Sequence, residues 1–322
     1  MRAGERDGRE SVPAKGCVIV PGNVIVVEGD LVVGLSNLQV AESSIDLGQG
    51  IVLRKTYAHM AASFLMAFKP APRGGYNPGP WKSAAGGFAF DVTAELLVPA
   101  NLGDDPGGRF RIAKTIVFLL RLWVDPACTA PVLSNHPFGD LPKIADKETK
   151  LLPFEVLPRY FPLSNREGVA TEAKIGWVRA NWEITDLLIV ESTEFALAVE
   201  ALSTGQFVSK TALTLIFLWA AIEALFSPST SELKFRVSSL VAAYLEPPGD
   251  ARAGLQRHVA SLYDLRSAAA HGKPRHEQDH LLGSFDLLRR ILTKMIEKQK
   301  VPSKDDLERT LFGAGQADVP GS

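Results

Sequence analysis

One uninterrupted apolar segment, residues 211–226 (TALTLIFLWAAIEALF), constrains the fold of this chain more than any other. It is shorter than the roughly 20 residues that a helix needs to cross a bilayer, and it contains a carboxylate, Glu223. We therefore expect a helix that is buried in the core of a globular protein. A buried carboxylate is costly unless a donor or a cation reaches it, so Glu223 needs a partner from another element.

The segment at residues 250–271 offers that partner. At about 100° per residue it predicts a helix with one apolar stripe, and Arg266 falls inside the stripe. The stripe consists of Leu255, Val259, Leu262, Leu265 and Ala269. A guanidinium in such a place cannot lose its charge and needs an acceptor. We expect Glu223 and Arg266 to meet, either as a structural ion pair or as part of a site.

A histidine, His271, occupies the last turn of this predicted helix. Gly272 and Pro274 follow and mark the end of the helix. Five residues correspond to about 140°, so His271 points away from Arg266 on a straight helix and instead shares a face with Ser267. His271 is therefore either a helix cap or a group that meets Arg266 through a bend or across a dimer.

Composition is ordinary for a soluble protein. The chain has 322 residues, of which 46% are hydrophobic and 22% charged, with a formal net charge of −1. No global basic field attracts nucleic acid, so we expect no DNA partner, and an RNA-binding surface must be local. The two cysteines are far apart, and the charged N-terminus lacks the apolar core of a signal peptide. We expect a cytoplasmic protein without a membrane partner.

The patterns along the chain predict an α+β protein. We expect a disordered tail at 1–14, a β-rich N-terminal domain at 15–175, a helical bundle at 176–302 and a C-terminal tail at 303–322. Strands are predicted at 17–35, 50–57, 88–99 and 175–178, with 61–68 as strand or helix and 69–88 as a Pro/Gly-rich loop. Helices are predicted at 110–123, 182–203, 207–226, from a capping box at Ser229 to about 246, and at 250–271, 276–299 and 304–312.

Three further patterns carry weaker chemistry. Residues 276–280 match HExxH, but they open an exposed helix, so a solvated helix start is favoured over a zinc site. Residues 81–83 (WKS) lack the glycine that a phosphate-binding loop needs before its lysine. The last long helix carries a basic face, which is a phosphate-binding surface or a solvated face. Its members are Arg289, Arg290, Lys294, Lys298 and Lys300.

Taken together, residues 218–245 and 262–272 resemble a known family. Arg266 and His271 have the R-x4-H form that marks HEPN domains, and the segments IEALF, SELKFR and LYDLRSAAAHG are similar to the Apea-like branch. The resemblance covers roughly residues 180–300. It implies a helical bundle that forms a homodimer, with Arg266 and His271 lining a cleft at the dimer interface.

The resemblance also implies an activity. Many HEPN domains are metal-independent endoribonucleases of antiviral or toxin–antitoxin systems, in which the ribose 2′-OH attacks the adjacent phosphate. His271 would act as general base or acid, and Arg266 would stabilise the charged phosphoryl oxygens. Glu223, Tyr263 and Ser267 would support them, with no cofactor. Ser267 stands where active members often have Asn, Asp or His, so a noncatalytic HEPN dimer acting as sensor, scaffold or interaction module is the alternative.

Overall fold

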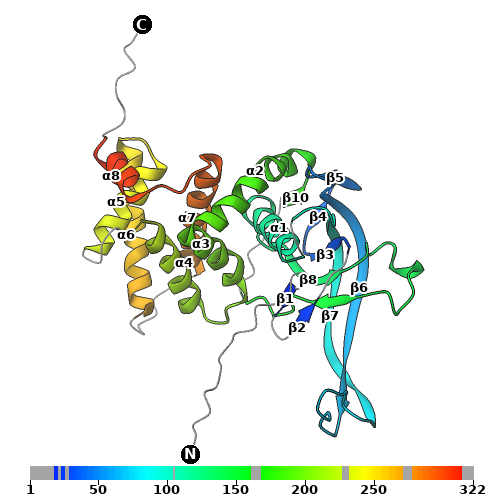
Figure 1. The fold of residues 1–322 in the computed structure, drawn as a ribbon. Helices are drawn as coiled ribbons and strands as arrows, with labels where there is room; N and C mark the ends of the chain where they lie inside the picture. Colours follow the sequence, from blue (N-terminus) through cyan, green and yellow to red (C-terminus); the bar gives the residue numbers. More distant parts are fainter. Residues whose placement is uncertain are drawn as a thin grey trace, which may run out of the picture. The chain divides into compact units, whose positions relative to one another are not determined.

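The computed structural model describes residues 18–20, 23–25, 29–103, 106–160, 168–226, 232–270 and 278–313. It combines an antiparallel sheet with helices, so the α+β class is confirmed (Figure 1). The chain forms two compact units: residues 1–114 with 130–155, and residues 115–129 with 156–322. The tail predicted at 1–14 lies outside the described residues.

The first unit is built on a six-stranded sheet with the order β5-β6-β7-β3-β8-β9. Its strands are β3 (Leu31–Ser36), β5 (Ser44–Asp46), β6 (Val52–Ala67), β7 (Trp81–Val98), β8 (Thr129–Ser134) and β9 (Leu151–Pro153). Every residue of β3 and β8 is buried. The sequence of β3 (LVVGLS) is accordingly almost entirely apolar, whereas β8 (TAPVLS) contains polar residues and was not predicted as a strand. Side chains of Val32, Val92, Val132 and Phe138 form one core cluster of this sheet.

One glycine on β3 is required by packing. A Cβ built on Gly34 would lie 2.8 Å from both the Phe138 ring and Val132.

Nearby on β7, Glu95 is buried, and burial raises the pKa of its carboxyl. Its Oε2 accepts a hydrogen bond from the backbone N–H of Phe138 at 2.7 Å, which satisfies part of the buried charge.

Shorter elements complete the strands and turns of the chain. They are β1 (Val18–Val20), β2 (Asn23–Ile25), β4 (Gln39–Val40), β10 (Val169–Ala170) and 3₁₀ turns at Leu141–Lys143 and Gly205–Phe207. β1 and β2 pair antiparallel with each other. The strand region predicted at 17–35 is therefore confirmed as three separate strands within the part that is described.

The hairpin of β6 and β7 is longer than predicted. The strands expected at 50–57 and 88–99 are present, and residues 61–67 belong to β6. The loop predicted at 69–88 is wrong beyond residue 80, because β7 begins at Trp81. Its first residues lack the alternation of apolar and polar side chains that marks a half-buried strand, because both faces of this part are exposed.

The second unit is helical. Its helices are α2 (Glu172–Glu191), α3 (Thr193–Thr204), α4 (Thr211–Phe226), α5 (Leu233–Leu245), α6 (Asp250–Ala270), α7 (Gln278–Glu297) and α8 (Lys304–Phe312). A further helix, α1 (Pro106–Leu119), continues into a π-helical turn at Leu120–Val124. Trp123 of this turn stacks on Trp177 of α2 with ring centroids 4.4 Å apart. The segment 115–129 is thus anchored to the helices that follow it much later in the sequence.

Two sequence predictions in this unit are wrong. The strand expected at 175–178 is the first part of α2, which Thr171 caps, and the helix expected at 182–203 is two helices. Ser192 ends α2 and also caps α3, since its hydroxyl accepts from the backbone N–H of Phe195 at 3.2 Å. The predicted capping residue Ser229 lies outside the described residues. Helices were predicted correctly over α1 with its π-helical turn and over α4, α5, α6, α7 and α8, within a few residues at each end.

Candidate functional site

The predicted pairing of Arg266 with Glu223 is present. Helix α4 presents Glu223 and helix α6 presents Arg266, and an Arg266 Nη2 atom lies 3.1 Å from Glu223 Oε1 and 3.2 Å from Oε2. The two side chains are 23% and 19% exposed. Only the contact to Oε2 has hydrogen-bond geometry. The charged groups therefore lie at the edge of the helical core, where each side chain is mostly buried but keeps some contact with water.

Tyr263 lies one turn before Arg266 on α6 and joins the pair. The guanidinium carbon of Arg266 lies 5.6 Å from the centre of the Tyr263 ring, a cation–π distance. Burial raises the pKa of the Tyr263 hydroxyl, the Glu223 charge and a hydrogen bond to Glu223 raise it further, and Arg266 opposes the rise. Tyr263 is thus held in its neutral, donating form. We call Glu223, Tyr263 and Arg266 the Arg–Glu–Tyr cluster.

Trp219 fixes the tyrosine in place. Its indole meets the Tyr263 ring edge-on at 5.3 Å, and its Nε1–H donates to Ser284 Oγ of α7 at 3.0 Å. Three helices therefore position one aromatic pair. Trp219 was not predicted as a site residue, although its spacing of four residues from Glu223 places both on one face of α4.

Two atoms of the cluster are buried with no hydrogen-bond partner among the described residues: Arg266 Nε and Glu223 Oε1. Buried polar atoms usually have partners, so these two mark unused hydrogen-bonding capacity. An unpaired guanidinium N–H suits an anionic oxygen. Arg266 Nε–H is therefore the free donor of the cluster, because the Tyr263 hydroxyl already donates to Glu223. An oxyanion reaches this buried donor only if the side chains around it move.

A pocket of about 450 Å³ adjoins the cluster at Tyr263. Lys234, Phe235, Ser238 and Gln256 are among its lining residues. The Phe235 side chain is 65% exposed, and Lys234 pairs with Asp264 at 2.6 Å. An exposed aromatic ring next to a lysine is a surface on which a nucleobase can stack.

The remaining residues predicted for this site divide into described and undescribed ones. Ser267 is half-buried on α6, directly after Arg266. His271 lies outside the described residues, as does His276 of the HExxH pattern. His280 lies in α7, and no group of three or more His, Cys, Asp or Glu side chains suited to a metal ion occurs among the residues with described positions.

The basic face predicted on the last long helix is largely paired with acceptors and an aromatic ring. Arg289 pairs with Asp286, Arg290 with Glu246 and Lys300 with Asp306, at 3.2, 2.8 and 2.7 Å. Lys294 donates to the carbonyl of Leu245, and both Lys294 and Lys298 lie over the ring of Tyr244. These contacts favour the solvated, structural reading over a phosphate-binding surface.

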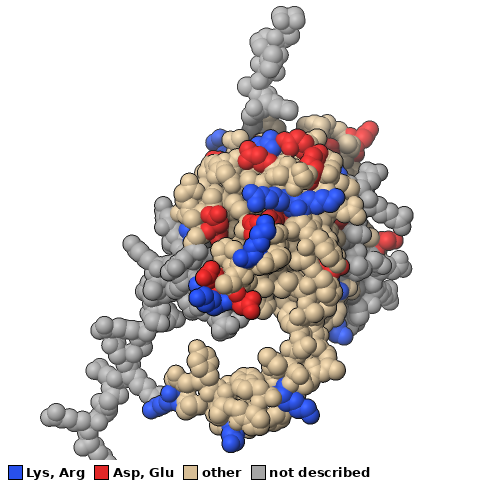
Figure 2. Space-filling view, turned by 90° about the vertical axis from the view of Figure 1, so that its right-hand side faces the viewer, with Lys and Arg blue, Asp and Glu red and all other residues tan. Residues whose placement is uncertain are grey.

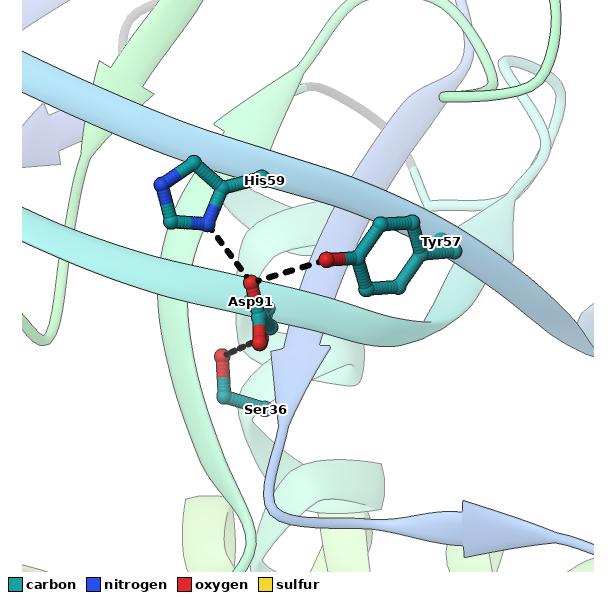
Figure 3. Close-up of polar contacts among 4 residues, drawn as sticks. All are labelled: Ser36, Tyr57, His59 and Asp91. Carbon is teal, nitrogen blue, oxygen red and sulfur yellow. Dashed lines mark hydrogen bonds and ion pairs between the residues drawn. The ribbon is translucent and has the colours of Figure 1, made fainter.

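A second polar cluster, which was not predicted from the sequence, lies in the first unit (Figure 3). Asp91 Oδ1 is 2.8 Å from His59 Nδ1 and accepts from the Tyr57 hydroxyl at 3.3 Å. The Ser36 hydroxyl donates to the backbone carbonyl of Asp91 at 2.5 Å. Ser36 therefore contacts Asp91 rather than the imidazole, so these four residues do not form a Ser-His-Asp triad. They brace the base of the β6–β7 hairpin.

No family model, no curated protein and no solved structure matches the chain. Among the described residues, no helix has the length and apolar character required to span a bilayer.

Proposed function

We propose that the helical part of this chain is an Apea-like HEPN bundle that cleaves RNA without a metal ion. Within the α+β fold, it would follow a β-rich N-terminal domain. The observation that carries the proposal is the Arg–Glu–Tyr cluster. Glu223 holds the arginine of the R-x4-H motif, and the Nε–H of that arginine has no hydrogen-bond partner among the described residues.

The chemistry follows from the roles that these groups are suited to play. Removal of the ribose 2′-OH proton by His271 starts the attack of that oxygen on the adjacent phosphorus. The bond to the 5′ oxygen of the next nucleotide breaks, and that oxygen leaves with a proton from the solvent. Arg266 stabilises the negative charge that builds on the phosphoryl oxygens. The products are a 2′,3′-cyclic phosphate and a free 5′-hydroxyl. Glu223 and Tyr263 are positioning residues, because each acts through Arg266.

We further propose that the chain works as a cytoplasmic homodimer in antiviral defence or toxin-like growth control. His271 lies five residues after Arg266, so the two point in different directions on one straight helix. Two copies bring an arginine from one protomer and a histidine from its partner into the same cleft. RNA is the expected partner, and the pocket beside Tyr263 is suited to a base next to the cleaved bond.

The test is RNA cleavage by the full chain and by Arg266→Ala and His271→Ala, in cells under an inducible promoter and with purified protein. Arg179→Ala is the matched control, because Arg179 also pairs with a carboxylate, Glu172, but is exposed. We expect cleavage and growth arrest in the native chain and the control, and neither in the two site variants. Products should carry cyclic phosphate ends and form equally well with EDTA.

A noncatalytic dimer is the alternative, and the same experiment separates the two. The Glu223–Arg266 contact also suits a purely structural ion pair. If RNA stays intact with and without infecting phage while the protein remains dimeric, the nuclease proposal fails and the scaffold remains. Cleavage that EDTA abolishes would instead direct attention to His276 and His280.

A further inference from the structure

The outer part of the β6–β7 hairpin pairs with no other strand among the described ones. β5 pairs with β6 only at residues 52–54, and β3 pairs with β7 only at residues 94–98. From residue 58 to residue 92 the two strands pair solely with each other. Residues 58–60 and 90–92 still lie near the core, since Ala58, Met60 and Phe90 pack against the core cluster and Val92 belongs to it. Beyond them the ribbon of residues 61–89, which we call the arm, extends away from the other strands of its sheet (Figure 1). A two-stranded ribbon of this kind is marginally stable in water unless something covers it.

The tip of the arm, residues 64–84, exposes large apolar side chains on both faces. Phe64 pairs with Ala84 and Met66 with Lys82, while Leu65 pairs with Ser83 and Ala67 with Trp81. Direct partners share a face and successive residues alternate, so Phe64 and Met66 lie on one face and Leu65 and Trp81 on the other. Exposed fractions are 59% for Phe64, 67% for Leu65, 64% for Phe68, 96% for Tyr76 and 53% for Trp81. Soluble proteins seldom leave such a group uncovered.

The arm also concentrates positive charge. No Asp or Glu occurs between Lys55 and Asp91, whereas the tip carries Lys69, Arg73 and Lys82, all exposed. The chain as a whole has a formal net charge of −1, so this charge is local. Figure 2 shows the contrast: the projection at the bottom of the view carries blue and no red, while the body above it is mixed.

A pair of glycines sets the geometry of the tip. Three residues of β7 (85–87) stand opposite one residue of β6 (Ser63), which makes a bulge. Gly87 has φ +114°, and a Cβ there would lie 1.7 Å from the carbonyl oxygen of Ala62. Only glycine fits at this position, so the bulge between the tip and the rest of the ribbon depends on Gly87.

We infer that the arm is a membrane-docking device whose tip inserts into the interfacial layer of an anionic lipid bilayer. Aromatic side chains favour the headgroup region, aliphatic ones the acyl boundary, and lysine and arginine the anionic surface. The tip combines all three. Attachment is interfacial and requires no membrane-spanning helix.

Two other occupants fit the tip less well. A second copy of the arm would bring three cations against three cations. A single-stranded RNA would neutralise the charge and stack on the aromatic rings, but it would leave the aliphatic Leu65 and Met66 against a polar backbone. A bilayer satisfies the charge and covers both faces at once.

The test is binding of the full chain to vesicles of phosphatidylcholine alone and of phosphatidylcholine mixed with phosphatidylglycerol. We expect sedimentation with the mixed vesicles and a blue shift of tryptophan emission that Trp81→Phe removes. Of the five tryptophans, Trp81 is the exposed one; the others are buried or half-buried. Reversing Lys69, Arg73 and Lys82 to Glu should weaken vesicle binding by more than about a hundredfold, since loss of each basic residue alone costs roughly fivefold at an anionic surface and the new carboxylates add repulsion.

The matched control reverses Lys143, Lys147 and Lys150, three exposed lysines of the same unit. If the control variant binds the mixed vesicles as weakly as the arm variant, the binding is nonspecific electrostatic attraction and the proposal is overturned. So would an absence of binding to mixed vesicles. RNA oligonucleotide binding or self-association that depends on the tip, without vesicle binding, would assign the tip to RNA or to a second copy. None of these results bears on Arg266 and His271, so the nuclease proposal stands or fails separately.

Discussion

Breaking the contact between Glu223 and Arg266 should destabilise the helical unit. The side chains are 19% and 23% exposed, so removing one leaves the other charge largely out of water. Loss of one partner from a fully buried pair costs about 3–5 kcal/mol, and the residual exposure reduces this to about 2–3 kcal/mol. We expect Glu223→Ala and Arg266→Ala each to lower the free energy of unfolding by that amount.

A double-mutant cycle isolates the contact itself. The double variant removes both charges, so it should lose less than the sum of the single variants, with a coupling free energy of about 1–2 kcal/mol. The control cycle uses Glu172 and Arg179, whose atoms are closer, at 2.7 Å, but whose side chains are 57% and 37% exposed. Its coupling should be about 0.3 kcal/mol, because water and salt screen exposed pairs.

The assay is urea unfolding followed by tryptophan fluorescence in a Trp81→Phe background. The four remaining tryptophans, Trp123, Trp177, Trp182 and Trp219, all belong to the helical unit, so the signal reports that unit. Midpoints and slopes from the four chains of each cycle give the coupling. A Glu223–Arg266 coupling no larger than that of the control would refute the reasoning that burial, rather than distance, sets the strength of these pairs.

Three other predictions concern single positions. The hydroxyl of Tyr244 is buried without a hydrogen-bond partner among the described residues, so Tyr244→Phe should raise the free energy of unfolding by about 0.5–1 kcal/mol. Burial raises the pKa of Tyr244, so the folded state binds the hydroxyl proton more tightly than the unfolded state does. The free energy of unfolding should therefore fall as pH rises above about 10. Urea titrations at about pH 9 and 11 should show a smaller fall in Tyr244→Phe than in the native chain. Gly87→Ala should increase hydrogen exchange in residues 58–67 and leave α4 and α6 protected, whereas unchanged exchange in the arm would contradict the close approach to Ala62. Hydrogen bonds from Lys300 and Ser303 hold the pKa of Asp306 at about 2, so the cap of α8 should persist as pH falls through about 4 and weaken only as pH approaches 2. Ser303→Ala should fray α8 at neutral pH, which hydrogen exchange would detect.

The sequence carried enough information for the buried pair but not for the arrangement around it. Glu223 stands out because the run around it is apolar, and Arg266 because its neighbours on the helix are apolar, so their pairing follows from the cost of buried charge. Trp219 gave no such signal, because an aromatic residue in an apolar helix needs no explanation. Its role depends on Ser284, 65 residues away in sequence, and only the packing of α4 on α7 brings them together.

Errors in secondary structure have a similar origin. Ile175 and Val178 are β-branched and favour strands locally, yet both are fully buried on one face of α2 together with Trp182. Tertiary burial overrides the local preference there. In the arm the opposite happens. An apolar segment forms a strand although no core lies against it, so neither face is buried and the sequence shows no alternation of apolar and polar residues.

The interleaving of the two units has a consequence for synthesis on the ribosome. Residues 115–129 leave the ribosome early, but their contacts in the helical unit come later: Trp177 stacks on Trp123, and Arg289 Nη1 donates to the carbonyl of Leu122 at 3.4 Å. All residues of the sheet unit have been synthesised once residue 155 has been added. The contact partners of residues 115–129, in contrast, extend as far as Arg289. During translation the π-helical turn is therefore a nascent-chain surface with Trp123 unstacked, and a truncated C-terminal fragment starting near residue 176 would lack both Trp123 and the carbonyl that Arg289 contacts.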